Sequence, residues 1–364
     1  MTWKWGDRMK IGIITFHRAA NYGAVLQAYA LQFYLTEKGN EVEIIDYRCK
    51  EIEKVHSPFY FLYIKGAKNK IKQFLRFPVR LNKRRIFDDF LNRKITLSIG
   101  TDKRNLKVLL QEKYDIVIAG SDQIWNPELI HGDTAYMLDF VPDSMVKISY
   151  AASFGLERLD VKTMALYKKF ISRFEKLSLR EQQGVAICRE VCDKEAVNTL
   201  DPTFLLRKKD WERFMTAPKY NNYVLLYMIK YSRKLIQTAQ KLAESEGKQL
   251  IFISDSMRRI RGIQYVSSAV PEEWVGLFYN AAYVVTNSFH GTAFSINFDK
   301  KMIVEGNTRI TDLLDKLAVK YVCEDSVIDL RENINWESVN AALDALREES
   351  CRFLECANMR KGTG

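Results

Sequence analysis

Apolar runs alternate with segments of helical spacing from residue 10 onward. Residues 10–16 (KIGIITF) are typical of a buried strand, and residues 24–38 carry apolar side chains at helical spacing. Residues 17–23 form the loop between them, and a second strand is predicted at 41–46. A strand, a glycine-containing loop, a helix and a strand in this order form a βαβ unit, which predicts a parallel sheet. The loop lacks the full G-x-G-x-x-G fingerprint, so the pattern does not indicate NAD or FAD.

The same alternation continues to the end of the chain and predicts an α/β fold. Two α/β domains facing each other across a cleft fit this order, with bounds at 9–203 and 204–335. Residues 336–364 contain a long helix that we expect to pack back on the first domain. The further strands are predicted at 114–119, 147–152, 177–179, 197–200, 223–229, 249–254, 263–267 and 301–304, and the further helices at 103–112, 161–175, from 183, 233–246, 271–281, 310–317 and 336–354.

An insertion at about 50–97 interrupts the first domain. It opens with the aromatic cluster FYFLY at 59–63 and predicts one or two basic amphipathic helices. One interpretation is a solvated helix pair that covers the active-site cleft, and the other is a patch that binds a membrane surface or another polyanion. Nucleic acid is disfavoured because no nucleic-acid-binding module accompanies the insertion. Its basic residues include Lys65, Lys68, Lys70, Lys72, Arg76, Arg80, Lys83, Arg84 and Arg85.

The segment 283–298 (YVVTNSFHGTAFSINF) places a histidine between a strand and a helix. Open α/β sheets bind ligands where a strand ends in small polar residues before a helix. Backbone N–H groups and the helix dipole make such a turn suitable for an anion. His290, one of four histidines in the chain, lies in this turn. The alternative is a capped helix whose histidine only hydrogen-bonds nearby backbone.

Polar residues follow two other predicted strands. Residues 120–127 (GSDQIWNP) are rich in hydrogen-bonding groups, although Asp122 has the alternative of capping a helix. Arg180 follows the strand at 177–179, where its guanidinium is suited to bind a phosphate or carboxylate in bidentate fashion. The alternative for Arg180 is an ion pair with Glu181 or another surface acid.

Charge and cysteine content restrict the partner and the compartment. The net charge of +11 favours an acidic partner: a phosphorylated or carboxylated substrate, an anionic membrane surface or nucleic acid. We expect a cytoplasmic protein, alternatively peripheral on the inner face of the membrane, because the first residues lack a signal-peptide core and no apolar run approaches the ~20 residues of a bilayer span. Six scattered cysteines without zinc spacing indicate reduced thiols.

Six segments together resemble the polysaccharide pyruvyl transferase family. They cover residues 10–317 in family order: IGIITFHRAANYGAVLQAYAL, DIVIAGSDQIWN, KISYAASFG, LSLREQQG, LDPTFLL and VVTNSFHGTAFSINF. The resemblance implies two Rossmann-like domains in a GT-B-like arrangement with the active site between them. It also implies phosphoenolpyruvate as the donor substrate, with no cofactor, and a sugar of a cell-surface glycan, alternatively lipid-linked, as the acceptor. We expect no metal, because the chain shows no metal ligand set and the chemistry requires none.

Two family positions carry over by residue. The histidine of the C-terminal motif corresponds to His290, and the arginine of the S-x-R-E motif corresponds to Arg180. Some members carry a second arginine where this chain has Ser288, and Arg309, before the next helix, is a candidate substitute. We therefore predict His290 and Arg180 as catalytic, Ser288, Gly291, Thr292 and Arg309 as donor-binding, and Asn21, Ser121, Asp122 and Gln123 as acceptor-binding.

Two other functions remain open from the sequence. A nucleotide-sugar glycosyltransferase of the same fold would use Arg180 and the helix start for a diphosphate. A non-catalytic protein would bind glycans or a membrane through the basic insertion.

Overall fold

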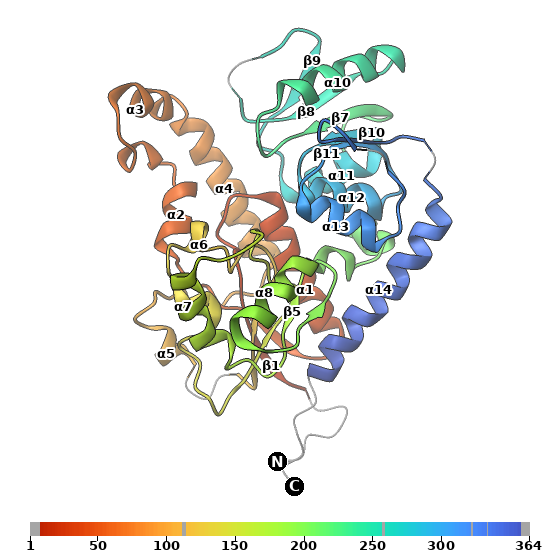
Figure 1. The fold of residues 1–364 in the computed structure, drawn as a ribbon. Coiled ribbons are helices and arrows are strands. Elements are labelled where there is room, and N and C mark those ends of the chain that lie inside the picture. Colours follow the sequence, from red (N-terminus) through yellow and green to blue (C-terminus); the bar gives the residue numbers. More distant parts are fainter. Residues whose placement is uncertain (1–7, 111–113, 257–258, 322, 333, 358–364) are drawn as a thin grey trace. The chain divides into compact units, whose positions relative to one another are not determined.

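The computed structural model describes residues 8–110, 114–256, 259–321, 323–332 and 334–357 (Figure 1). The chain divides into two compact units. Unit 1 comprises the chain up to Leu205 together with the segment from Leu346, and unit 2 comprises Leu206–Ala345. Within the described residues, none of the helices combines the length and apolar character that a membrane span requires.

Unit 1 is built on a parallel sheet with the strand order β2-β1-β3-β4. Backbone bridges join the pair β5-β6 to the chain at the end of β4, through Ile148 with Lys176 and Ala152 with Leu179. The carboxyl ends of parallel strands meet at one edge, so the loops that follow these strands come together there. The strands are β1 (Lys10–Ile14), β2 (Glu41–Ile44), β3 (Ile116–Ala119), β4 (Val146–Ser149), β5 (Ser178–Leu179) and β6 (Val197–Asn198).

Fully buried aliphatic side chains explain why these strands form. Ile11, Ile13 and Val117 are inaccessible to solvent, as expected for a sheet covered on both faces. Helix α1 is also buried along most of its length, and its Gln27 donates to Thr15 Oγ1 at 2.9 Å. The helices outside the insertion are α1 (Tyr22–Glu37), α5 (Leu106–Leu109), α6 (Pro127–Ile130), η2 (Thr134–Met137), α7 (Val161–Ile171), α8 (Gln182–Cys192) and η3 (Pro202–Phe204).

The insertion contains three α-helices and one 3₁₀ turn: α2 (Lys50–His56), η1 (Tyr60–Leu62), α3 (Ala67–Phe74) and α4 (Phe77–Lys94). The basic stretch for which one or two helices were predicted forms two, α3 and α4, while α2 precedes it. Gly66 at φ +87° separates η1 from α3, and Pro78 lies in the first turn of α4. Helix α4 anchors the insertion, since Phe87, Phe90 and Leu91 are buried. Helix α3, in contrast, buries no residue.

Unit 2 contains a seven-stranded sheet with the order β12-β13-β11-β10-β7-β8-β9. Strands β7 to β11 are parallel, and β13 and β12 add an antiparallel edge. The sequence prediction missed β12 and β13, which are short, and in β13 buried residues alternate with more exposed ones. The elements are α9 (Lys208–Phe214), β7 (Tyr223–Tyr227), α10 (Arg233–Ser245), β8 (Leu250–Ile253), β9 (Ile263–Val266), α11 (Pro271–Asn280), β10 (Ala281–Thr286), α12 (Phe289–Asn297), β11 (Lys301–Glu305), α13 (Thr308–Lys316), β12 (Cys323–Glu324) and β13 (Val327–Leu330).

The last helix, α14 (Trp336–Ala357), belongs to unit 2 up to Ala345 and to unit 1 from Leu346. In its unit 1 part, Ser350 Oγ accepts from the Leu200 N–H at 3.0 Å, and Arg347 Nε donates to the Phe204 carbonyl at 2.6 Å. These contacts tie the end of the chain to the segment that follows β6.

Candidate functional site

The turn that carries His290 lies at the switch point of the unit 2 sheet. Strand β10 pairs with β7 on one side and β11 on the other, while β8 and β9 extend the sheet beyond β7. The connections therefore diverge between β7 and β10, where doubly wound sheets bind ligands beyond the carboxyl ends of their strands. The residues that follow β10 occupy this position.

Asn287 holds the two strand ends together. Its Oδ1 accepts from the Ile229 N–H at 3.0 Å, and its Nδ2 donates to the Lys230 carbonyl at 2.7 Å. The side chain is 8% exposed. Its bonds therefore take the place of hydrogen bonds to water for the two backbone groups that follow β7. The sequence prediction did not include Asn287 among the site residues, although it lies in the same turn.

Ser288 caps helix α12. Its Oγ accepts from the Gly291 N–H at 3.2 Å, and its carbonyl accepts from the Thr292 N–H at 2.9 Å and from Thr292 Oγ1 at 3.1 Å. The two N–H groups that the sequence suggested as anion donors are thus engaged inside the turn. That Gly291 and Thr292 bind the donor stays a prediction.

Gly291 allows the tight approach of this turn to β10. A Cβ at this position would lie 2.5 Å from Thr286 Oγ1 and 3.2 Å from Ser288 Cβ, which no side chain tolerates without displacing them. The sequence Ser-Phe-His-Gly therefore packs the helix start closely against the end of the strand.

His290 lies in the first turn of α12 and is 9% exposed. Its ring meets that of Phe289 edge to face at 5.3 Å between centroids. Arg309, the candidate substitute for the family arginine, lies in the first turn of helix α13 after β11. Its backbone N–H donates to Asn307 Oδ1 at 3.2 Å. Since β10 and β11 are parallel neighbours, His290 and Arg309 follow strand ends at the same edge of the sheet.

In unit 1, a buried carboxylate organises the corresponding edge. Asp201 is 1% exposed, and its Oδ2 accepts from Arg180 Nη1 at 2.9 Å and from Ser121 Oγ at 3.1 Å. Its Oδ1 accepts from the backbone N–H and the hydroxyl of Thr203 at 3.0 and 2.8 Å. The predicted domain bounds, 9–203 and 204–335, placed this residue next to the boundary between the domains. Asp201 instead connects the loops that follow β3, β5 and β6.

Arg180 is surrounded by three carboxylates. Besides the contact with Asp201, its Nε lies 3.8 Å from Glu181 Oε2 and its Nη2 lies 3.9 Å from Asp122 Oδ1. Burial of the guanidinium opposes its charge, but the three carboxylates outweigh this effect and raise the pKa of Arg180. The alternative interpretation of this arginine was an ion pair with Glu181 or a surface acid. The ion pair is present, but its main partner is the buried Asp201. That Arg180 also binds the donor stays a prediction.

The four predicted acceptor residues lie in the loops after the neighbouring strands β1 and β3. Asn21 caps α1 with a long 3.4 Å contact to the Ala24 N–H, whereas Ser121 is fully buried against Asp201. Asp122 has φ +76° and its Oδ1 accepts from the Gln123 N–H at 2.8 Å. It caps no helix, because Asn126 caps the next one, α6. Gln123 Oε1 accepts from Asn126 Nδ2 at 3.0 Å.

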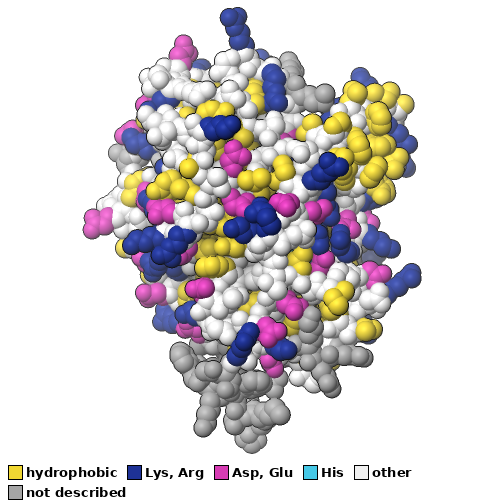
Figure 2. Space-filling view, turned by 180° about the vertical axis from the view of Figure 1, so that it is seen from behind, with side chains coloured by type: hydrophobic (Ala, Val, Ile, Leu, Met, Phe, Trp, Pro, Cys, Tyr) yellow, Lys and Arg dark blue, Asp and Glu magenta, His cyan; other side chains and the backbone are white. Residues whose placement is uncertain are grey.

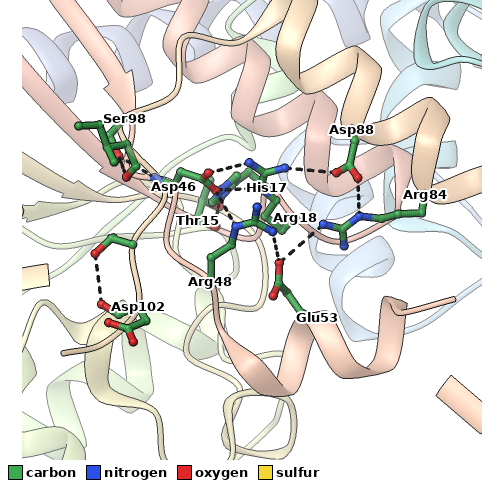
Figure 3. A network of polar contacts seen from close by, with 12 residues as sticks. Thr15, His17, Arg18, Asp46, Arg48, Glu53, Arg84, Asp88, Ser98 and Asp102 are labelled. Carbon is green, nitrogen blue, oxygen red and sulfur yellow. Dashed lines mark hydrogen bonds and ion pairs between the residues drawn. The ribbon is translucent and has the colours of Figure 1, made fainter. Parts of the chain in front are cut away.

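A second buried network follows β1 and β2 (Figure 3). His17 Nε2 lies 3.0 Å from Asp46 Oδ1, and Arg18 donates to both oxygens of Asp46 at 2.7 and 2.6 Å. Burial acts to raise the pKa of the Asp46 carboxyl, but the bonds from His17 and Arg18 hold it well below its usual range. Arg18 also contacts Asp88 of α4 at 3.2 Å, so the network joins the sheet edge to the insertion. The sequence prediction missed these residues, although their positions directly after two strands are a usable signal.

Comparisons with known proteins agree with this architecture. The UDP-GlcNAc 2-epimerase from Methanocaldococcus jannaschii is 15% identical with a TM-score of 0.52, and the match covers 95% of this chain and 99% of that chain. A putative UDP-N-acetylglucosamine 2-epimerase from Listeria monocytogenes is 12% identical with a TM-score of 0.53, and the match covers 98% and 93%. These similarities confirm the predicted fold class, α/β with two Rossmann-like domains of the GT-B type. No curated protein matches the chain.

The family comparison covers both sheet edges. Residues 21–309 match the family described as polysaccharide pyruvyl transferase, which includes the loops after β3 and β5 and the turn with His290. The chain therefore belongs to the polysaccharide pyruvyl transferase family.

Proposed function

We propose that this protein transfers a pyruvyl group from phosphoenolpyruvate to a sugar of a cell-surface polysaccharide or of its lipid-linked precursor, with formation of a ketal. The observation that carries the proposal is the position of His290, in the first turn of α12 at the switch point of a parallel sheet, within the family match. An imidazole suits proton transfer near neutral pH.

The chemistry defines what the residues must do. C3 of phosphoenolpyruvate gains a proton, which makes C2 electrophilic. Two sugar hydroxyls then form C–O bonds to C2 and lose their protons, while the C2–O bond to phosphate breaks and hydrogen phosphate leaves. His290 moves protons in this sequence, and Arg309 is the candidate cation of unit 2 for the charge of the donor.

In unit 1, Asn21, Asp122 and Gln123 are the residues proposed to bind the acceptor sugar. Their side chains carry the carboxylate and amide groups that hydrogen-bond sugar hydroxyls. Ser121 and Arg180 take part in the proposal through Asp201, because the buried contacts with this carboxylate fix the loop that carries Asp122.

The decisive experiment supplies the purified protein with phosphoenolpyruvate labelled in the pyruvyl carbons and a bacterial saccharide fraction as acceptor. We expect label in the saccharide and release of one phosphate per pyruvyl group. His290→Gln should lower kcat by about 10²–10⁴-fold because proton transfer is lost. Urea unfolding of the same variant separates this loss from any effect of the lost ring contact with Phe289. His131→Gln is the matched control, since His131 lies exposed at the end of α6.

Near-normal turnover of His290→Gln would refute the role of this imidazole. Consumption of a nucleotide sugar instead of phosphoenolpyruvate would replace the proposal with glycosyl transfer on the same fold.

A further inference from the structure

The insertion concentrates the positive charge of the chain. Residues 54–87 contain ten Lys and Arg residues and no Asp or Glu, in a protein whose formal net charge is +11. The remainder of the chain is thus nearly neutral. A charge excess confined to one surface segment indicates an anionic partner for that segment.

The same segment exposes large hydrophobic side chains. Among the described residues, seven of the fifteen large exposed hydrophobic side chains lie between residues 55 and 75, each 49–62% exposed: Val55, Phe59, Leu62, Tyr63, Ile71, Phe74 and Leu75. Figure 2 shows hydrophobic side chains gathered beside Lys and Arg on the part of the molecule that contains η1 and α3. Soluble monomers rarely leave such a contiguous patch in water, so the patch marks an interaction site.

The helical geometry of α3 separates the apolar and basic residues. Ile71, Phe74 and Leu75 follow the i, i+3, i+4 spacing of one helix face. Successive residues of an α-helix are 100° apart around its axis. Lys68 and Lys72 therefore lie at one border of this face, and Lys70 lies at the other. The ring of Phe74 meets Phe61 of η1 edge to face at 5.3 Å, which joins the apolar faces of the two elements.

We propose that this η1–α3 surface docks the protein on an anionic phospholipid bilayer. The apolar face enters the boundary between headgroups and acyl chains, and the bordering lysines contact the lipid phosphates. A soluble polyanion would use the lysines but leave the apolar face in water, so the combination favours a lipid surface. The inference does not rest on the proposed function, because docking requires no catalysis.

Helix α4 connects the docking surface to the sheet of unit 1. Arg84 of α4 contacts Asp88 at 2.8 Å, and Asp88 contacts Arg18 in the loop after β1 (Figure 3). Together with the buried Phe87 and Phe90, these ion pairs hold the base of the insertion while α3 stays unburied. Because α4 attaches the insertion firmly to unit 1, docking of α3 also holds unit 1 at the membrane.

Flotation of the full-length protein with lipid vesicles tests the proposal. We expect the protein to float with vesicles of phosphatidylcholine and phosphatidylglycerol, not with phosphatidylcholine alone, and to be released by high salt. Lys68→Gln with Lys72→Gln should lower the partition coefficient about fivefold per lysine. Ile71→Ser with Phe74→Ser should lower it about tenfold or more through the loss of apolar burial.

The matched control is Val161→Ser with Lys162→Gln, which removes one exposed apolar and one exposed basic side chain from α7 and should leave flotation unchanged. Circular dichroism and thermal unfolding verify that the α3 variants fold, as expected for a helix that buries no residue. Failure of the wild-type protein to float with anionic vesicles would overturn the proposal. Flotation of the Ile71→Ser/Phe74→Ser variant equal to that of the wild type would also overturn it. The same holds if the wild type is an oligomer and this variant is a monomer, because the surface would then bind a second copy of the chain.

Discussion

The two sheet edges use different interactions to hold their loops. In unit 1, Arg180 is buried among Asp201, Glu181 and Asp122, and Asp46 is buried against His17 and Arg18. In unit 2, residues 287–292 (NSFHGT) contain no carboxylate, and amide and hydroxyl groups bind the backbone.

This difference predicts different responses to change. A buried charge remains stable only while its partners are present and ionised, because removal of one partner leaves the other in a medium of low polarity. Breaking a neutral hydrogen bond lowers the free energy of unfolding by less. Unit 1 should therefore be the part of the molecule that is sensitive to charge and pH, while the turn of unit 2 keeps its shape around His290.

The largest expected effect comes from the centre of the unit 1 edge. Arg180→Met should lower the free energy of unfolding by about 3–5 kcal/mol, because it leaves Asp201 and Glu181 buried without their cation. Urea unfolding followed by circular dichroism measures this loss. Arg207→Met is the matched control, since the pair of Arg207 with Asp344 is exposed and should contribute less than about 1 kcal/mol. Equal losses for the two variants would remove the distinction between buried and exposed pairs.

The second prediction concerns acid pH. The pKa of Asp46 is held low in the folded protein, so its contribution to stability is fully present above the ordinary carboxyl pKa of about 3.9 and is lost as the pH falls below it. The difference in unfolding free energy between the wild type and Asp46→Asn should thus shrink by about 2–3 kcal/mol from pH 5 to pH 2. Urea titrations at several pH values measure it. A difference that stays constant with pH would contradict the role of charge in this network.

The third prediction removes the uncharged hydrogen bonds of Asn287 at the sheet edge of unit 2. Asn287→Ala should lower the free energy of unfolding by about 1–2 kcal/mol, because backbone groups of Ile229 and Lys230 lose their partner. The loss should not change between pH 5 and pH 2, in contrast to that of Asp46→Asn. Asn82→Ala, at an exposed position of α4, is the control and should change stability by less than about 0.5 kcal/mol. A loss in Asn287→Ala that varies with pH would show that unit 2 also depends on ionised groups.

The sequence predicted most of the fold because the strands are continuous apolar runs. Strands β1, β3, β7 and β10 lie where these runs occur, since a sheet covered by helices requires both faces of each strand to be apolar. The antiparallel strand β13 was missed because its burial alternates over only four residues. The predicted helix at 103–112 is reduced to α5, Leu106–Leu109, and residues 111 and 112 of that prediction lie outside the described part of the chain.

The site residues could be predicted only in part from the sequence, because residues that contact one another in the site are far apart along the chain. Strand-end position identified Arg180, Asp122 and His290 as polar residues at the sheet edges. It did not identify Asp201, which lies 21 residues after Arg180 and looks like part of a linker. The pair of His17 and Asp46 is separated by 29 residues and forms only because β1 and β2 are neighbours. Spacing along the chain carries no signal for such contacts.

The smallest expected effect concerns His56, which sharpens the description of unit 1 as the charge-dependent unit. Burial, followed by the charges of Lys83, Arg80 and Arg84, lowers the pKa of His56 to about 4. Because the folded value lies below the ordinary pKa of about 6.5, the unfolded chain binds the proton more readily, and this group reduces stability as the pH falls below about 6.5. NMR titration of the imidazole C–H signals should give a midpoint near 4, and Lys83→Met should raise it. Lys162→Met, at an exposed position of α7, should leave it unchanged. A His56 midpoint at the ordinary value would mean that the cations of α4 do not act on the end of α2, and the charge-dependent region of unit 1 would then end at the network of Asp46.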